Sequence, residues 1–352
     1  MAKRLLNVPS SGRLAELDLV SYGRRGRHTP LHFSTAQLDQ IGRTVRGVPE
    51  VMVKVSGGGK SAGAAQAHFA YIDRHGKLEV HTDSGERLQG KAVADHLVQA
   101  WNLDVGRGQY RPSPRGGEKD RRPKQVHNIV FSMPQGTPPE RLLLATQKFA
   151  REKFALRHRY AMVLHTDQRH PHVHLVVKAV SEQGERLYIR KATLREWREN
   201  FAGYLRELGV AANATPIQLR GRPKAEKREG IYRALKRGRS TFMRSKVESV
   251  AGELLRGRVT PDHGKAKLLA TRSSVVADWK ATASLLREQG HERLATDIES
   301  YVRQMPVVAT DKERLAKGLL AQLATQRSRI SPPNRSARSE IGPVEAALIL
   351  RP

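Results

Sequence analysis

The chain has 352 residues, no cysteine and a formal net charge of +29. Its length suffices for two domains, and the lack of cysteine excludes disulfides, thiolate zinc sites and cysteine nucleophiles. No stretch is apolar enough to span a membrane, and no secretory signal follows the basic start. The charge therefore favours nucleic acid as the partner and no membrane insertion. A basic ribosome-associated or chromatin-like protein is the alternative on composition alone.

Strands and helices alternate through the first two thirds of the chain. Residues 1–48 are basic and rich in turn formers, and predict a mobile arm. The patterning then predicts strands over 51–55, 78–82, 126–132, 160–166, 172–180 and 186–190, and helices over 62–73, 91–102, 138–155 and 193–208. The turn between the strands at 160–166 and 172–180 is too short for a parallel crossover. We therefore expect an α+β fold with a central antiparallel sheet and helices packed on it.

The last third of the chain is helical in pattern and carries no recognisable chemical motif. It ends in a proline-containing segment that is predicted to be disordered. We expect a basic N-terminal arm, an α+β domain, a basic DNA-binding linker, a helical domain and a disordered tail, over 1–48, 49–215, 216–245, 246–327 and 328–352 respectively.

Four histidines lie within the ten residues from His165 to His174. His172 and His174 point to one face of the predicted strand, about 7 Å apart along it. A hairpin turn before them places His165 opposite the pair. Three neutral imidazoles bind a divalent ion and leave positions open for substrate oxygens. Histidines scattered over a basic surface are the alternative explanation.

Two residues of the connecting turn have open roles. Asp167 either holds a ligand histidine in place or is an ordinary turn residue. His170 either contacts DNA or has no part in the site.

The pattern His165-x-Asp-x-x-His-Pro-His-x-His174 resembles the three-histidine motif of relaxases, the HUH-type strand-transfer nucleases of conjugative and mobilisable DNA. The resemblance is to the MobP branch, which includes the T-DNA-nicking relaxase of plant-transforming bacteria. Residues 53–80 resemble the block that holds the catalytic tyrosine of this branch, and residues 127–137 resemble its middle motif. The three blocks cover about residues 50–215, so the domain at 49–215 is expected to be the relaxase domain. Lys178 stands where the branch usually carries Asn.

The resemblance implies site- and strand-specific nicking at an origin of transfer, with a 5′-phosphotyrosyl link between DNA and protein. Tyrosine attack conserves bond energy for later rejoining, and a bound cation, Mg²⁺ or Mn²⁺, stabilises charge on the phosphate. Tyr71 is the expected nucleophile, with a core tyrosine beside Phe69 as the alternative role and Tyr22 as the second candidate nucleophile. The middle motif puts Ser132 and His127 near the DNA or the nucleophile, or else they only fill a strand.

Two basic stretches, 105–124 and 222–244, are expected to neutralise the DNA backbone, with two tyrosines that stack on bases. The expected DNA-binding residues are Arg107, Tyr110, Arg111, Arg121, Arg122, Lys124, Arg222, Lys224, Arg228, Tyr232, Lys236 and Arg237. Relaxases also imply single-stranded and origin DNA, a relaxosome accessory protein and a type IV coupling protein as partners. They imply the bacterial cytoplasm as location, with export alongside DNA.

Two other functions fit parts of the pattern. A rolling-circle replication initiator shares the histidine pair, but fits the glycine-rich and middle blocks less well. A non-enzymatic basic DNA-binding accessory protein would use the histidines only for structural metal binding. Formation of a covalent adduct with DNA separates the accessory protein from the two nucleases.

Overall fold

The computed structural model describes residues 32–103, 123–216, 219–220, 234, 237–257, 260, 262 and 264–330. The first 31 residues of the predicted arm, most of both basic stretches and the predicted tail from residue 331 lie outside the described residues.

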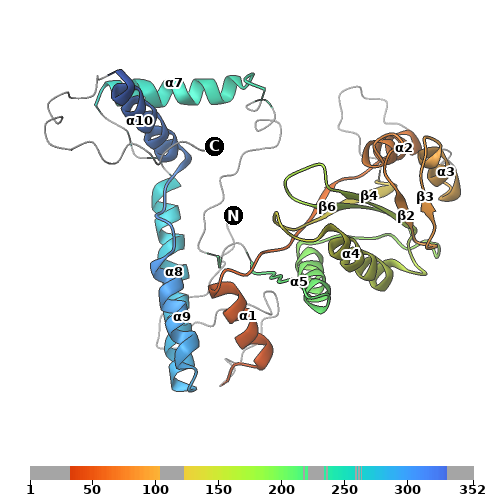
Figure 1. The fold of residues 1–352 in the computed structure, drawn as a ribbon, viewed down its shortest axis with the longest axis horizontal. Helices are drawn as coiled ribbons and strands as arrows, with labels where there is room; N and C mark the ends of the chain where they lie inside the picture. The colour runs from red at the N-terminus through yellow and green to blue at the C-terminus, as the bar shows by residue number, and fades with distance from the viewer. Residues whose placement is uncertain are drawn as a thin grey trace, which may run out of the picture. The chain divides into compact units, whose positions relative to one another are not determined.

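A six-stranded sheet in the order β1-β4-β6-β5-β2-β3 forms the centre of the first part of the chain, and all its neighbouring strands are antiparallel (Figure 1). The strands are β1 (Met52–Gly57), β2 (Val80–Thr82), β3 (Arg87–Leu88), β4 (Val126–Ser132), β5 (Tyr160–His165) and β6 (His172–Lys178). The helices packed on it are α2 (Ala62–Ile72), α3 (Val93–Ala100), α4 (Pro139–Phe154) and α5 (Lys191–Glu207). The predicted α+β fold with a central antiparallel sheet is confirmed.

The two faces of the sheet carry different cores. On one face Val173, Leu175 and Val177 of β6 pack with α4 and α5, around Phe149 and Phe201. On the other face Val176 packs with α2 and α3. Because β6 is covered on both sides, its sequence is almost continuously apolar, and each fully buried large side chain stabilises the fold by about 1.5–3 kcal/mol. The histidines interrupt this apolar run at the end of the strand that begins with His172.

Helix α1 (Thr35–Val45) precedes the sheet, so the prediction of a mobile arm is wrong for these residues. The Ser34 side chain accepts a hydrogen bond from the backbone N–H of Gln37, whose side chain accepts one from the Ser34 backbone N–H. This reciprocal capping is encoded by Ser-x-x-Gln and was the missed signal. Thr44 then bonds to Thr215 over 2.8 Å, which ties α1 to the end of the α+β region.

The predicted strand at 186–190 is also wrong. Only an isolated bridge between Val180 and Arg186 forms there. β6 already has β4 on one edge and β5 on the other, so no edge of β6 remains for another strand to pair along its length. Sequence patterning shows that a segment suits a strand but not whether a partner edge is free.

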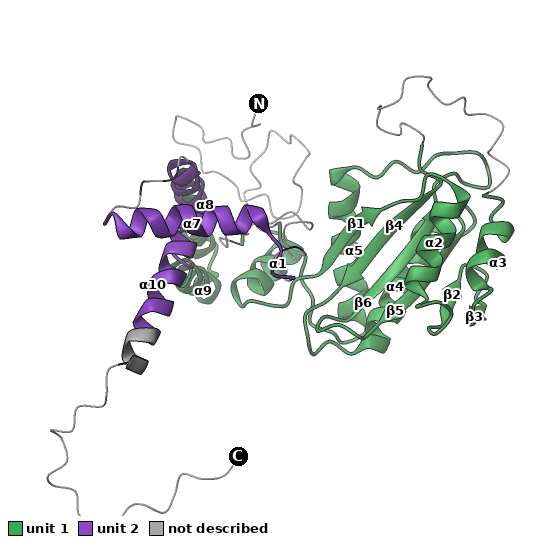
Figure 2. Cartoon of the chain, turned by 90° about the horizontal axis from the view of Figure 1, so that it is seen from above, with its two compact units in different colours: residues 1–221, 276–305 green, residues 222–275, 306–352 purple. Residues whose placement is uncertain are grey.

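The last third of the chain is helical, as expected, with α7 (Thr241–Leu255), α8 (Gly264–Glu288), α9 (Glu292–Arg303) and α10 (Asp311–Ile330). Two compact units divide the chain: residues 1–221 with 276–305, and residues 222–275 with 306–352 (Figure 2). The boundary falls inside α8, and the predicted domain limits stay a prediction. Within the second unit α7 packs on α10, where Lys312 pairs with Glu253 at 2.7 Å. Among the described helices, none has the length and apolar character needed to cross a membrane.

Candidate active site

The three predicted ligands meet where β5 and β6 adjoin. The antiparallel register sets His165 opposite His172, and Val163 opposite His174. The ring centroids of the three histidines are 4.6–5.1 Å apart. One nitrogen of each ring lies within 4.8 Å of the others, and among the described residues this is the one such group of His, Asp and Glu side chains that could hold a metal ion. The hairpin geometry expected from the sequence thus brings His165, His172 and His174 together; we call them the histidine triad.

Hydrogen bonds to backbone carbonyls fix two rings of the triad. His165 Nε2 donates to the carbonyl of Ile72 at 2.6 Å, and His172 Nδ1 donates to the carbonyl of His170 at 3.1 Å. A carbonyl only accepts, so these nitrogens carry the protons. The lone pairs are therefore on Nδ1 of His165 and Nε2 of His172. Such bonds orient imidazoles for a metal ion, and His170 contributes its carbonyl rather than its exposed ring.

The surroundings of His165 and His174 keep these two imidazoles neutral. Burial, followed by the nearby rings of His165, His172 and His68 and the Arg74 guanidinium, lowers the pKa of His174 to about 3. Burial also lowers the pKa of His165. Neutral imidazole is the form that binds metal. These histidines are thus held in the ligating form at neutral pH.

The residues of the triad fit a divalent ion on a further observation. His174 Nδ1 is buried and has no hydrogen-bond partner, although a buried polar atom without a partner is rare and costs free energy. A set of three imidazole nitrogens suits later transition metals by affinity, while Mg²⁺ and Mn²⁺ are the ions expected from the family resemblance.

Tyr71 lies on α2, which covers the triad face of the sheet. Its ring centroid is 6.4 Å from that of His174, and its side chain is 52% exposed. The alternative role of a core tyrosine does not fit this exposure, since Phe69 and Ile72 are the buried residues of that stretch. An exposed hydroxyl-bearing ring therefore lies beside the histidine triad.

His68, one turn before Tyr71 on α2, was missed by the sequence analysis. Its ring stacks on Tyr71 with centroids 6.2 Å apart and meets His174 edge-on at 6.3 Å. Its Nε2 is buried without a partner, and burial lowers the pKa of His68 to about 4. The available signal was its i, i+3 spacing from Tyr71 on a predicted helix, which puts both on one side.

Arg74 was also missed. Its Nη2 donates to Asp167 Oδ2 at 2.7 Å and to His165 Nδ1 at 3.2 Å. Partial burial lowers the pKa of Arg74, but its hydrogen bonds to Asp167 and Tyr71 outweigh this and raise it. In turn, the hydrogen bond from Arg74 lowers the pKa of Asp167. Asp167 is thus connected to His165 through Arg74, and the choice between its two expected roles stays a prediction.

The middle motif divides between the two faces of the sheet. Ser132 pairs with His172 across β4 and β6, and its hydroxyl donates to the carbonyl of Pro171 at 3.2 Å. His127 pairs with Val177 and lies two residues before Ile129, so the two share a face of β4. The side chain of Ile129 lies in the core under α4 and α5. The structure therefore brings Ser132 to the triad and leaves His127 on the opposite face.

Lys178, the departure from the family pattern, lies about 13 Å along β6 from His174 at about 3.3 Å per residue. It pairs with Glu182 at 3.0 Å. Its substitution for Asn therefore does not touch the triad.

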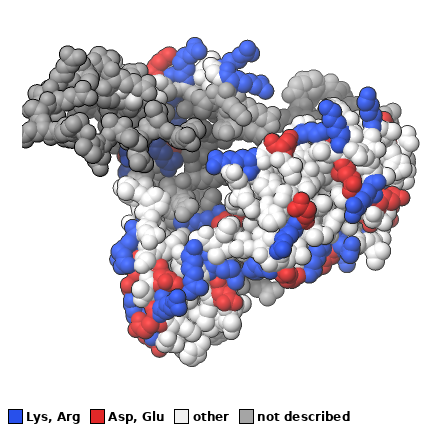
Figure 3. All heavy atoms as spheres, in the orientation of Figure 1, with Lys and Arg blue, Asp and Glu red and all other residues white. Residues whose placement is uncertain are grey.

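Of the expected DNA-binding residues, only two are described. Lys124 donates to the carbonyl of Gly57 at 3.1 Å, and Arg237 lies in an exposed turn. On the face drawn in Figure 3, lysine and arginine side chains of the described residues are interspersed with acidic ones. The other expected DNA-binding residues fall outside the described residues: Arg107, Tyr110, Arg111, Arg121, Arg122, Arg222, Lys224, Arg228, Tyr232 and Lys236. So does Tyr22, the second candidate nucleophile.

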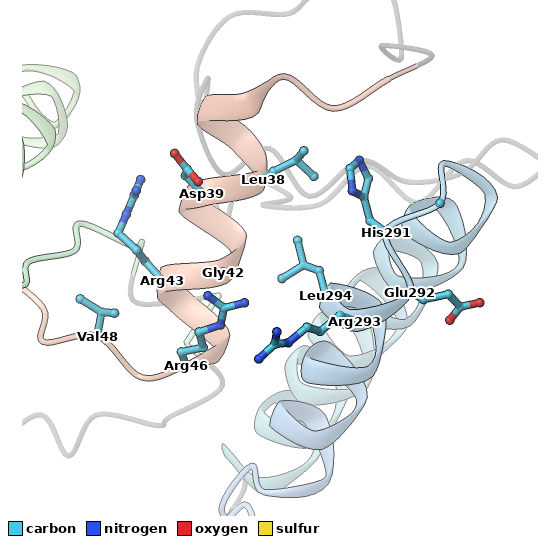
Figure 4. A pocket seen from close by; sticks show the side chains of 11 residues that line it. Leu38, Asp39, Gly42, Arg43, Arg46, Val48, His291, Glu292, Arg293 and Leu294 are labelled. Atoms are coloured by element: carbon cyan, nitrogen blue, oxygen red, sulfur yellow. The ribbon is translucent and has the colours of Figure 1, made fainter.

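A separate pocket of about 520 Å³ lies between α1 and the start of α9. Arg43, Arg46 and Arg293 line it together with the acidic Asp39 and Glu292 (Figure 4). Arg46 is paired with Asp297 at 3.2 Å. The mixed charge and the paired arginine give this pocket no clear preference for an anion.

The sheet with its histidine triad and the tyrosine on the helix above it define a candidate metal-dependent nuclease centre. Residues 113–210 match the relaxase family, described as the MobA/VirD2-like nuclease domain. This match contains the triad and begins after Tyr71. It agrees with the relaxase resemblance predicted from the three sequence blocks.

Individual relatives agree with the family match. The chain is 28% identical over 138 residues to the T-DNA border endonuclease VirD2 of Rhizobium radiobacter, which covers 36% of this chain and 31% of the relative. It is 27% identical over 138 residues to the protein of the same description from Agrobacterium fabrum (strain C58 / ATCC 33970), covering 36% and 30%. The matches thus span less than a third of the length of these relatives. They support a relaxase of the MobP or VirD2 type, as the sequence predicted.

One solved structure, described as "Molecular Basis of Vancomycin Resistance Transfer in Staphylococcus aureus", is 14% identical and covers 48% of this chain and 99% of its own. Its TM-score of 0.27 is too low to indicate a shared fold.

Proposed function

We propose that this protein nicks one strand of DNA at an origin of transfer, with Tyr71 as nucleophile and the histidine triad as the site of a divalent ion. The observation that carries the proposal is the 6.4 Å distance between the ring centroids of Tyr71 and His174. The two residues belong to different elements and are more than a hundred residues apart in sequence. The nicking serves conjugative transfer or mobilisation. The relaxosome and type IV partners, and the cytoplasmic location with export, stay predictions.

The reaction is a transesterification. The Tyr71 hydroxyl oxygen forms a bond to the scissile phosphorus while the bond from phosphorus to the 3′ oxygen breaks. The phenolic proton passes to solvent, and the leaving 3′ oxygen takes up a proton. The product is a 5′-phosphotyrosyl link and a free 3′ hydroxyl, and attack by such a hydroxyl reverses the step.

The chain's own residues prepare this step. The exposed ring of Tyr71 is held above the triad by α2, which converts an encounter into an oriented attack. The backbone bonds of His165 and His172 fix their lone pairs. A divalent ion held by the triad supplies charge stabilisation at the phosphate oxygens.

The proposal predicts an SDS-resistant adduct between the protein and labelled single-stranded oligonucleotides from candidate origins, in the presence of Mn²⁺ or Mg²⁺. Tyr71→Phe should abolish the adduct because it removes the attacking oxygen, whereas Tyr188→Phe, at an exposed tyrosine outside the site, should retain it. His174→Ala should lower the yield by about 100-fold or more, as expected for loss of electrostatic stabilisation.

Mass spectrometry of the digested adduct identifies the nucleophile. Cleavage after Lys60 and Arg74 gives a peptide in which Tyr71 is the single tyrosine, and cleavage after Arg13 and Arg24 gives one with Tyr22 alone. Nucleotide mass on the Tyr22 peptide would transfer the nucleophile role to that residue. Absence of any adduct with several origins would favour the accessory DNA-binding protein.

A further inference from the structure

The turn after α2 has an unfavourable backbone conformation. Arg74 and His75 have φ angles of 56° and 57°, and Gly76 follows at 82°. Non-glycine residues rarely adopt such angles, and the strain persists where the surrounding structure requires it, often at functional sites. Here the turn directs the Arg74 side chain back over the histidine triad. The reaction described above makes no use of this arginine.

The Arg74 guanidinium contacts three parts of the site at once. Its Nη2 lies 2.7 Å from Asp167 Oδ2 and 3.2 Å from His165 Nδ1. Its Nη1 donates to the Tyr71 carbonyl at 3.3 Å, and its central carbon is 5.2 Å from the centroid of the Tyr71 ring. One cation therefore bridges a candidate metal ligand, the candidate nucleophile and an exposed carboxylate.

The contact with His165 conflicts with metal binding. A guanidinium has donors and no acceptor, so Nδ1 of His165 must accept from it. His165 Nε2 is occupied by its 2.6 Å bond to the Ile72 carbonyl, which leaves the Nδ1 lone pair as the one available to an ion. The same lone pair cannot accept a hydrogen bond from Arg74 and bind a metal ion at the same time.

We propose that Arg74 occupies the lone pair of His165 in the metal-free protein and moves to the scissile phosphate when a divalent ion takes its place. The planar guanidinium suits a phosphate, which it binds through two parallel hydrogen bonds. Asp167, with 53% of its side chain exposed, holds the arginine at the edge of the site in both positions. The phosphate step rests on the proposed nicking reaction, whereas the competition with the ion does not.

The competition is tested by calorimetric titration of the full-length protein with Mn²⁺ in the absence of DNA. Arg74→Ala should bind Mn²⁺ about 5- to 10-fold more tightly, because a competing donor and a like charge are both removed. Asp167→Asn should bind Mn²⁺ more weakly, because it removes a negative charge while the competing arginine remains in the chain. Arg87→Ala is the control for lost positive charge, since Arg87 is 70% exposed on β3 and pairs with Glu79.

The two variants are expected to change Mn²⁺ affinity in opposite directions, which separates competition from damage to the fold. General destabilisation of the site would weaken Mn²⁺ binding in both the Arg74 and Asp167 variants. Unchanged or weaker binding by Arg74→Ala, or an equal gain in Arg87→Ala, would overturn the proposal. Arg74→Lys retains the charge without the planar fork and should fall between wild type and Arg74→Ala.

The phosphate step is tested by the rate of adduct formation at saturating Mn²⁺. Arg74→Ala should slow the reaction by about 100-fold or more despite its tighter ion binding, as for loss of one stabilising donor. Partial recovery in Arg74→Lys is expected. An undiminished rate in Arg74→Ala would overturn this step. If wild type forms no adduct, the proposed nicking fails, while the Mn²⁺ titrations still decide the competition.

Discussion

His68 and His174 each bury a ring nitrogen that has no hydrogen-bond partner. Leaving a buried polar atom unsatisfied costs about 1–3 kcal/mol, so two such atoms side by side are a local defect that the fold tolerates. For His174, an ion bound through this nitrogen would meet the need. The ring centroid of His68 lies 6.3 Å from that of His174. Part of the cost of burying unsatisfied polar atoms thus falls on residues at the candidate site.

The buried His68 predicts a loss of stability in acid. Its folded-state pKa of about 4 lies below the ordinary value of 6.5, so the unfolded chain binds the proton more readily. The free energy of unfolding should therefore be unaffected by His68 above pH 6.5 and fall as the pH drops from 6.5 towards 4. Urea unfolding of the metal-free protein across this range measures it.

His68→Phe is the matched control, because it keeps a ring at the position and removes the titrating group. The other histidines titrate in both proteins, so the difference between their unfolding free energies isolates His68. We expect wild type to lose stability relative to His68→Phe as the pH falls. Parallel curves would show that His68 is accessible to protons in the folded protein.

At the scale of elements, local sequence patterning predicted much of the fold. The turn too short for a crossover predicted the antiparallel hairpin, and the i, i+2 spacing of His172 and His174 predicted a shared face; both are present in the structure. Features that depend on contacts between distant residues could not be predicted from the sequence. The role of Arg74 arises from a left-handed turn that folds it onto His165, 91 residues away. The sequence shows neither the turn angles nor the free lone pair they approach.

The same turn can be tested through Gly76. Its φ is 82°, and a Cβ there would lie 2.3 Å from the backbone carbon of Gly90. Gly76→Ala should destabilise the protein by about 2–5 kcal/mol, from about 1–2 for the left-handed angle and about 1–3 for the clash. It should also slow adduct formation, because the displaced turn carries Arg74. Thermal and urea unfolding measure the first effect.

Gly85→Ala separates the angle from the clash. Gly85 has a φ of 87° but no atom within 4 Å of an added Cβ. It should lose only the cost of the angle, about 1–2 kcal/mol, and should form the adduct at the normal rate. Equal losses for the two variants would mean that the backbone near Gly90 adapts to the added methyl group.

At the scale of the whole molecule, both hydrophobic cores of the sheet lie between residues 51 and 214. The predicted α+β domain begins at residue 49, so it leaves out α1, and its limits stay a prediction. Thr44 and Asn213 join α1 to the end of the domain by a hydrogen bond of 3.2 Å. Contact between segments so distant in sequence cannot be read from local periodicity. For the same reason, the sequence could not show that residues 276–305 belong to the first compact unit.

The net charge of +29 makes a prediction for the molecule as a whole. If the basic stretches neutralise DNA phosphates, affinity for a single-stranded oligonucleotide should fall with salt, with a slope of about 0.7 log units per phosphate contacted. Replacing both Arg121 and Arg122 by Ala should lower that slope by about 1.4 if each contacts one phosphate. Fluorescence anisotropy at several salt concentrations measures it.

Arg287→Ala should leave the slope unchanged, because this arginine is paired with Glu299 at 2.6 Å. His174→Ala should also preserve the slope while lowering the adduct yield, because in the proposed reaction the triad would act on one phosphate and the basic stretches on many. A slope that fell equally in all three variants would place the DNA contacts elsewhere.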